Sequence, residues 1–284
     1  MTMDTTAYPR TGMTLRTPLA GSRKTETGRP PEEGRKRRSK KGSSLADTII
    51  SLLIIVGAAV WFFQFTHAGY MKSVPYRASF ERLAENVYVN RDYAGDKTVI
   101  PKLVERAKAR DAEFFGGLEC PDETVVIICD DEEMIKKLGY DHHTNSYWFP
   151  VKKSYICVSD KYLNEDILSH EFTHAELYSR VSAKRMAEVP TWFNEGLAMQ
   201  NDLREHFGEE YWRIITDNGK NTVAHEDMDE AEEFYADPAD ERMKRYICSK
   251  HEVSKWLGTH GIQGLMELID RVNKGEDFST AYSG

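Results

Sequence analysis

The chain has 284 residues, which is enough for one good-sized catalytic domain with appendages. Its net charge of −8 is unevenly distributed: residues 1–46 carry 11 Lys and Arg against 4 acids, whereas the rest of the chain carries 27 against 42. Nucleic-acid binding needs a basic surface that meets phosphates, so the acidic body excludes nucleic acid as a partner.

Residues 1–46 predict a disordered, basic, cytoplasmic tail. They are rich in Thr, Ser, Gly, Pro, Lys and Arg and have almost no large apolar side chains. Such a segment cannot bury enough apolar surface to offset the entropy lost on ordering. The tail ends in a basic run over residues 35–41.

Residues 47–67 predict a transmembrane helix. Residues 48–65 carry no charge, and as an α-helix they would span about 27 Å, close to the hydrocarbon thickness of a bilayer. The basic run before them predicts a cytoplasmic N-terminus, which places residues 69–284 outside the cytoplasm. Two alternatives stay open: a cleaved signal peptide with its processing site at Thr66-His67-Ala68, and a buried core helix.

The four cysteines are Cys120, Cys129, Cys157 and Cys248, and their spacing matches no Cys-x-x-Cys site. Outside the cytoplasm two disulfides could form, and buried free thiols are the alternative.

Beyond the span we expect a connector over residues 68–96 and one domain over residues 97–284. Apolar periodicity predicts helices over residues 98–115 and 131–138, from Asn164, from 189–191, and over residues 246–256 and 263–272. Short apolar runs predict strands over residues 124–129 and 154–159, and residues 139–150 are expected to be a loop. Residues 218–242 are an acidic, poorly periodic stretch, and its part from His225 to Glu241 is expected to be a solvated loop, with a lid that favours basic substrates as the alternative.

The most informative motif is His170-Glu171-Phe172-Thr173-His174. Residues four apart share a helix face, so both imidazoles can reach one zinc ion, and Glu171 is placed to act as a general base on a water at that ion. Zinc needs a third protein ligand and keeps one position for water. Leu177 and Arg180 occupy the positions where a three-histidine pattern needs Gly and His, which excludes that pattern.

A carboxylate from a following segment is the other common third ligand. Glu176, Glu188 and Glu195 are the nearest choices. Glu176 is too close in sequence to turn back to its own helix face, and Glu188 lies in the connection before Pro190. Glu195 lies about one turn inside the next helix, so it is the expected ligand.

These two segments together, His170 to His174 and Trp192-Phe193-Asn194-Glu195-Gly196, resemble the gluzincin metallopeptidases and, more weakly, small peptidase MA-like domains. The resemblance covers about residues 120–200. It implies an α+β, thermolysin-like core with a small sheet, a helical C-terminal part, zinc bound by His170, His174 and Glu195, and a peptide or protein substrate. It also implies that residues 154–159 form the edge strand that binds substrate.

An oxyanion stabiliser is also needed, because zinc only partly neutralises the charge of a tetrahedral intermediate. The family uses a Tyr, so Tyr246 is expected in this role, with Tyr235 and His225 as further candidates. Two features depart from the aminopeptidase branch: twenty residues separate His174 from Glu195 instead of eighteen, and the Gly-x-Met-Glu-Asn amine anchor is missing. The missing anchor favours an endopeptidase.

The sequence therefore predicts a membrane-anchored zinc endopeptidase whose domain lies outside the cytoplasm. The alternatives are a catalytically inactive zinc-binding scaffold of the cell envelope and a metal-free binding module tethered to the membrane. His142 and His143 are expected to be solvated. The oligomeric state is left open.

Overall fold

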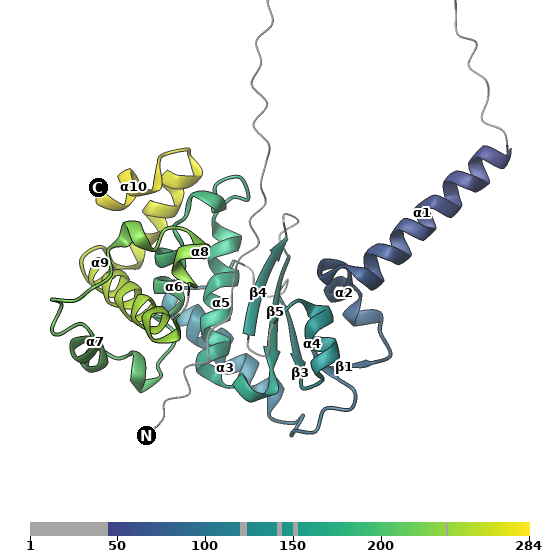
Figure 1. The fold of residues 1–284 in the computed structure, drawn as a ribbon, viewed down its shortest axis with the longest axis horizontal. Helices are drawn as coiled ribbons and strands as arrows, with labels where there is room; N and C mark the ends of the chain where they lie inside the picture. The colour runs from purple at the N-terminus through teal and green to yellow at the C-terminus, as the bar shows by residue number, and fades with distance from the viewer. Residues whose placement is uncertain (1–44, 120–123, 141–143, 150–152, 237) are drawn as a thin grey trace, which may run out of the picture.

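The computed structural model describes residues 45–119, 124–140, 144–149, 153–236 and 238–284 (Figure 1). The α-helices of this part are α1 (Leu45–Phe65), α2 (His67–Ser73), α3 (Ile100–Phe115), α4 (Glu132–Leu138), α5 (Glu165–Arg180), α6 (Thr191–Ala198), α7 (Glu209–Ile215), α8 (Ala231–Phe234), α9 (Ala239–Asn273) and α10 (Phe278–Ser283). Short 3₁₀ turns connect several of them: η1 (Val74–Tyr76), η2 (Asp160–Tyr162), η3 (Met186–Glu188), η4 (Glu205–Phe207) and η5 (His225–Asp227).

One mixed sheet forms the β part of the fold. Its strands are β1 (Phe80–Ala84), β2 (Val87–Asn90), β3 (Val125–Cys129), β4 (Thr144–Phe149) and β5 (Lys153–Ser159), in the order β1-β2-β3-β5-β4. The pairs β2–β3 and β3–β5 are parallel, whereas the outer pairs β1–β2 and β4–β5 are antiparallel. A mixed sheet with many helices confirms the predicted α+β class. The segment expected to be a connector contributes β1 and β2.

The sequence prediction for the edge of the sheet is wrong. Residues 144–149 lie in the predicted loop 139–150, yet they form β4, and β4 is the outermost strand next to β5. The predicted edge strand, residues 154–159, is instead paired on both sides. Residues 144–149 show neither a continuous apolar run nor a strict alternation of polar and apolar residues, so periodicity predicts no strand there.

The sheet separates two layers of helices (Figure 1). On one face, Tyr70, Met71 and Val74 from α2 and η1 pack with Ile135 and Leu138 of α4. On the other face, α3 and α5 pack through alternate strand residues, with Val104, Phe172 and Ala175 among the contacts. Strand residues point to opposite faces in turn, so one strand supplies both cores.

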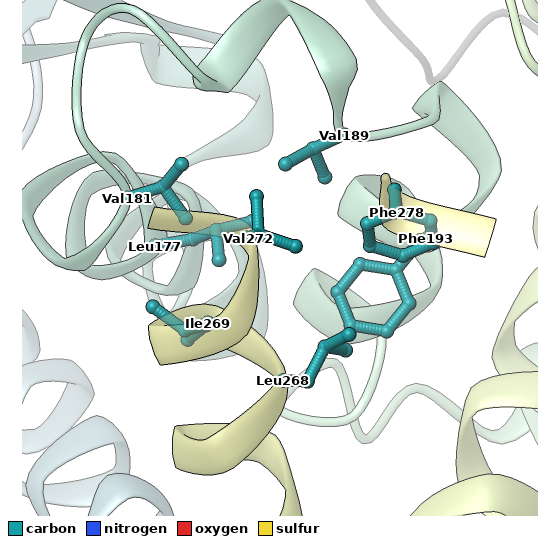
Figure 2. Close-up of a pocket in the computed structure, with 8 residues that line it drawn as sticks. All are labelled: Leu177, Val181, Val189, Phe193, Leu268, Ile269, Val272 and Phe278. Carbon is teal, nitrogen blue, oxygen red and sulfur yellow. The ribbon is translucent and has the colours of Figure 1, made fainter. Parts of the chain in front are cut away.

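The helical half of the molecule packs on the outer side of α5. Its core joins α5, α6, α9 and α10, with Phe193, Tyr246 and Leu265 among the buried side chains. The cavity in this core has a volume of about 10 Å³ and is lined only by apolar side chains, so it is a packing defect and not a ligand site (Figure 2). The two predicted C-terminal helices form α9, which breaks at Gly261 (φ +64°).

Helix α1 extends away from the rest of the molecule (Figure 1). No part of the segment Asp47–Phe65 is buried, although the mean hydropathy of this segment is 2.2. This exposure contradicts the alternative of a buried core helix. A membrane span and a signal sequence both fit the helix.

Candidate metal centre

Helix α5 presents the two histidines. Asn164 is its N-cap, as predicted, and the Asn164 side chain accepts a hydrogen bond from the Ile167 backbone N–H at 2.9 Å. Residues 167–177 are all buried, because the helix is covered by the sheet on one side and by the helical half on the other. His170 and His174 are 5% and 1% exposed, so the site is inside the protein.

Helix α6 places the Glu195 side chain beside His170 and His174. Backbone N–H groups at its start donate to backbone oxygens of the acidic stretch: Thr191 to Asp229 and Trp192 to Met228. These bonds satisfy amides that have no partner within the helix. The stretch predicted to be a solvated loop is therefore packed against α6 here, and Met228 and Phe234 are fully buried.

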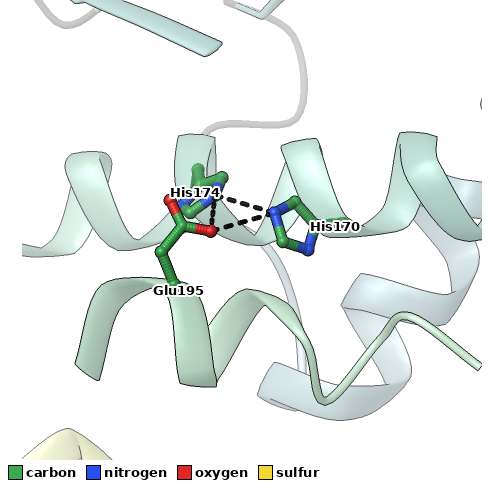
Figure 3. A group of neighbouring side chains, drawn as sticks. All are labelled: His170, His174 and Glu195. Atoms are coloured by element: carbon green, nitrogen blue, oxygen red, sulfur yellow. Dashed lines mark hydrogen bonds and ion pairs between the residues drawn. The ribbon is translucent and has the colours of Figure 1, made fainter. Parts of the chain in front are cut away.

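Three ligand atoms converge between the two helices (Figure 3). The Nε2 atoms of His170 and His174 are 3.1 Å apart, and Glu195 Oε2 is 3.3 Å from the first and 3.5 Å from the second. Two ligands at zinc bond lengths of about 2.0–2.1 Å in tetrahedral geometry lie roughly 3.3 Å apart. The three donors therefore fit one zinc ion without rearrangement.

Electrostatics also favour a cation at this point. Burial opposes protonation of His174, but the Glu195 carboxylate outweighs it and raises the pKa of His174 to about 9. Burial would raise the pKa of Glu195, yet His174 and His170 hold it far below the ordinary value. A buried carboxylate that stays ionised beside two imidazoles needs a positive partner, which can be a proton or a metal ion.

Asn194 orients His174. Its Oδ1 is 2.9 Å from His174 Nδ1, and its Nδ2 is 3.4 Å from the Tyr178 hydroxyl. Because an amide oxygen can only accept, His174 donates from Nδ1, which leaves Nε2 to face Glu195 as a ligand atom. Sequence reasoning quoted Asn194 in the motif but assigned it no role.

Glu171 has a free carboxylate oxygen inside the protein. The residue is 2% exposed, and its Oε2 has no hydrogen-bond partner among the described residues. Its backbone oxygen accepts from the Ser146 hydroxyl at 3.0 Å, which ties edge strand β4 to the motif helix. A buried acceptor without a partner costs free energy unless a ligand or water supplies a donor.

Thr173, between the two histidines, anchors α5 to a buried polar network. Its hydroxyl donates to Asp111 Oδ1 at 2.6 Å, and Asn201 Nδ2 donates to the same oxygen at 2.8 Å. Burial raises the pKa of Asp111 well above its ordinary value. Sequence reasoning missed Asp111, although it falls on the buried stripe of α3 with Val104 and Ala107.

Two tyrosines lie behind Glu195. The Tyr235 hydroxyl donates to Glu195 Oε1, and burial together with Glu195 raises the pKa of Tyr235. Tyr246 is 1% exposed on α9 and contacts Phe234 edge-to-face at 4.9 Å, with its ring 6.4 Å from that of Tyr235. His225 stacks on Trp192 at 4.5 Å. The tyrosine that the structure joins to the ligand set is therefore Tyr235.

The remaining predicted residues contribute no further metal site within the described ranges, where His170, His174 and Glu195 form the one such group. Cys129, Cys157 and Cys248 are buried free thiols, whereas Cys120, His142 and His143 lie outside the described residues.

Comparisons with known proteins add no family to this picture. No protein-family model matches the chain, and searches of curated proteins and of solved structures found no match. The function is therefore argued from the site alone.

Proposed function

We propose that this protein is a membrane-anchored, zinc-dependent peptidase of the gluzincin type that hydrolyses peptide bonds outside the cytoplasm. The observation that carries the proposal is the convergence of three buried ligand atoms, 3.1 to 3.5 Å apart, next to a buried glutamate with a free oxygen. A three-ligand site leaves one position open, which is the arrangement of catalytic rather than structural zinc.

His170, His174 and Glu195 would hold the ion through two Nε2 atoms and one carboxylate oxygen. Zinc in such a site supplies Lewis-acid polarisation of a carbonyl and lowers the pKa of a bound water. Glu171 accepts the proton of the attacking water at Oε2, for which no other hydrogen-bond partner exists among the described residues, and returns it to the leaving amine.

Strand β4 is the surface on which an extended substrate would align. It is the outer strand beside β5, and the Ser146 hydroxyl ties it to the backbone of Glu171. A peptide that adds to this edge gains main-chain hydrogen bonds whatever its side chains. Edge binding of this kind suits cleavage within a chain, which supports an endopeptidase.

Helix α1 supports anchoring rather than removal. His67 and Ala68 are the first residues of α2, and the Thr66 side chain caps that helix. Cleavage after residue 68 would remove the cap and the first two residues of a helix whose Tyr70 and Met71 are buried against the sheet.

The test of the peptidase is metal content and turnover of the full chain in detergent. The wild type should carry about one zinc per chain, and Glu195→Ala should lose it. Glu171→Gln should keep the zinc and lose cleavage of a peptide library, since an amide cannot accept the proton. Absence of zinc from the wild type would overturn the proposal. A zinc-loaded wild type that cleaves no peptide would make the protein a zinc-binding scaffold.

A further inference from the structure

The junction between α1 and α2 is a tight corner. The Thr66 hydroxyl donates to the Phe62 backbone oxygen at 2.8 Å and accepts from the Gly69 backbone N–H at 3.0 Å. A side chain on Gly69 would collide with the backbone oxygen of Phe62, so the two helices approach as closely as their backbones allow. The Thr66 hydroxyl is therefore hydrogen-bonded to both helices at this corner, to α1 through Phe62 and to α2 through Gly69.

Arg77, which follows η1, also binds the C-terminal end of α1. Its Nη2 donates to the Phe63 backbone oxygen at 2.5 Å and its Nη1 to Gln64 at 3.4 Å, while its guanidinium lies 3.9 Å from the centroid of the Tyr70 ring. The last carbonyls of a helix have no partner within it, and here the folded domain supplies one. Helix α1 thus ends in fixed contact with the domain.

The C-terminal end of α4 lies beside the C-terminal end of α1. His67, two residues beyond Phe65, has its Nδ1 3.1 Å from the Lys137 backbone oxygen. Lys136 and Lys137 are exposed in the last turn of α4, and neither amine forms an ion pair with a described residue. Glu132 and Glu133 occupy the first turn, one turn or about 6 Å before the lysines along the helix axis.

An exposed aromatic residue accompanies these lysines. Tyr76 in η1 is 90% exposed and directly precedes Arg77. Aromatic rings at the end of a membrane span prefer the headgroup region, and lysines beside an anionic leaflet are attracted to it. A carboxylate in the same place would be repelled, and the acids of α4 lie one turn before the lysines, in the first turn of the helix.

We propose that Tyr76, Lys136 and Lys137 form a membrane-contact face that binds anionic lipid headgroups and holds the domain in one orientation on the bilayer. The inference rests on the membrane-anchored part of the proposed function and not on the metal site. The sheet lies between this face and α5, because α2 and α4 cover one side of it and α5 covers the other. The ligand cluster therefore lies on the side of the sheet turned away from this face.

The test is lysine acetylation of the full wild-type chain in lipid nanodiscs, read by mass spectrometry. Nanodiscs of phosphatidylcholine are compared with nanodiscs that also contain phosphatidylglycerol. With phosphatidylglycerol, Lys136 and Lys137 should react roughly fivefold more slowly, the factor that corresponds to the surface attraction of one lysine. Lys102 and Lys184 are the matched controls, because they are exposed on α3 and in the helical half and should react equally in both lipids.

Two results would overturn the inference in distinguishable ways. If alkaline washing releases the chain from membranes, both the anchor and the contact face are wrong. If the chain stays in the membrane and Lys136 and Lys137 react as fast as the controls in both lipids, the anchor stands and the contact face alone is wrong. In the full wild-type chain, phosphatidylglycerol should also slow backbone hydrogen exchange in residues 74–78, which include Tyr76. The double variant K136E/K137E should lose this slowing, whereas K102E/K184E should retain it.

Discussion

The orientation of His174 depends on Asn194, which directly precedes Glu195 in the sequence. Asn194 lies on α6 with the carboxylate ligand, and its Oδ1 accepts from Nδ1 of His174 on α5. One short segment thus provides both a candidate metal ligand and the group that orients His174. Partners of this kind typically change metal affinity when they are removed.

We expect Asn194→Ala to weaken zinc binding about 10- to 100-fold, because His174 loses the acceptor that fixes its ring. Asn194→Asp should restore most of the affinity, since a carboxylate also accepts from Nδ1. Competition with a fluorescent chelator measures both variants. Equal affinities of the wild type and Asn194→Ala would show that packing alone orients the ring.

Removing the hydroxyl group of Tyr235 or of Tyr246 distinguishes the roles of these two residues. We expect Tyr235→Phe to lower peptide turnover about 10-fold or more and to weaken zinc binding, because Glu195 loses a charge-assisted hydrogen bond. Tyr246→Phe is the matched variant, since the Tyr246 ring packs against Phe234 beside Tyr235. A loss of turnover in Tyr246→Phe at full zinc occupancy would instead support Tyr246 as the oxyanion stabiliser.

At the scale of elements, the position of α6 is set by its contact with α9. A Cβ on Gly196 would meet the Ser249 backbone oxygen at 2.5 Å and a Val253 methyl group at 2.7 Å. A glycine at this position allows the close helix approach. The structure shows that the partner at this glycine is α9, and Glu195 is held beside α5 as a result.

We expect Gly196→Ala to destabilise the fold by about 1–3 kcal/mol, because the added methyl group forces two packed helices apart. Gly258→Ala is the matched control, since nothing lies within 4 Å of its Cβ position in α9. In a helix interior that change should stabilise by about 0.5–1 kcal/mol. Urea unfolding measures both. A neutral Gly196→Ala would mean that α6 and α9 can separate freely.

At the scale of the whole molecule, Asp111 joins parts that are far apart in the chain. It accepts from Thr173 on α5 and from Asn201 just after α6, while α3 carries Asp111 itself. Arg110 adds a bond from its Nη1 to the Asn201 backbone oxygen at 2.9 Å. The helices that hold the ligands are therefore fastened to α3 at one buried carboxyl group.

This carboxyl group makes stability depend on pH. Its pKa is raised by burial, so its contribution is complete below the unfolded pKa of about 3.9 and is lost as pH rises towards the folded pKa. Over this window the free energy of unfolding should fall by up to about 1.4 kcal/mol per pH unit. Asp111→Asn should remove that slope and keep the bond acceptor, whereas the exposed control Asp92→Asn should keep the slope. Urea unfolding at several pH values measures the three proteins, and equal slopes would contradict a protonated Asp111.

Much of this protein is encoded in short stretches of sequence. The apolar helix α1, the Asn164 cap and the helix that carries both histidines depend on neighbours within a few turns, so periodicity and capping predicted them. Glu195 could be chosen because its helix follows the motif closely. For the same reason, the α+β class and the two-histidine motif helix with its carboxylate partner could be expected before any coordinates.

Tertiary structure decided what distant segments do together. Several features depend on pairs separated by long stretches of chain. They are the edge position of β4, the bonds from Tyr235 to Glu195 and from Thr173 to Asp111, and the place of Lys137 beside the end of α1. Such pairs leave no local period, because packing of whole layers brings them together. The candidate ligands could therefore be chosen from the sequence, whereas their hydrogen-bond partners and the proposed membrane-contact face required the fold.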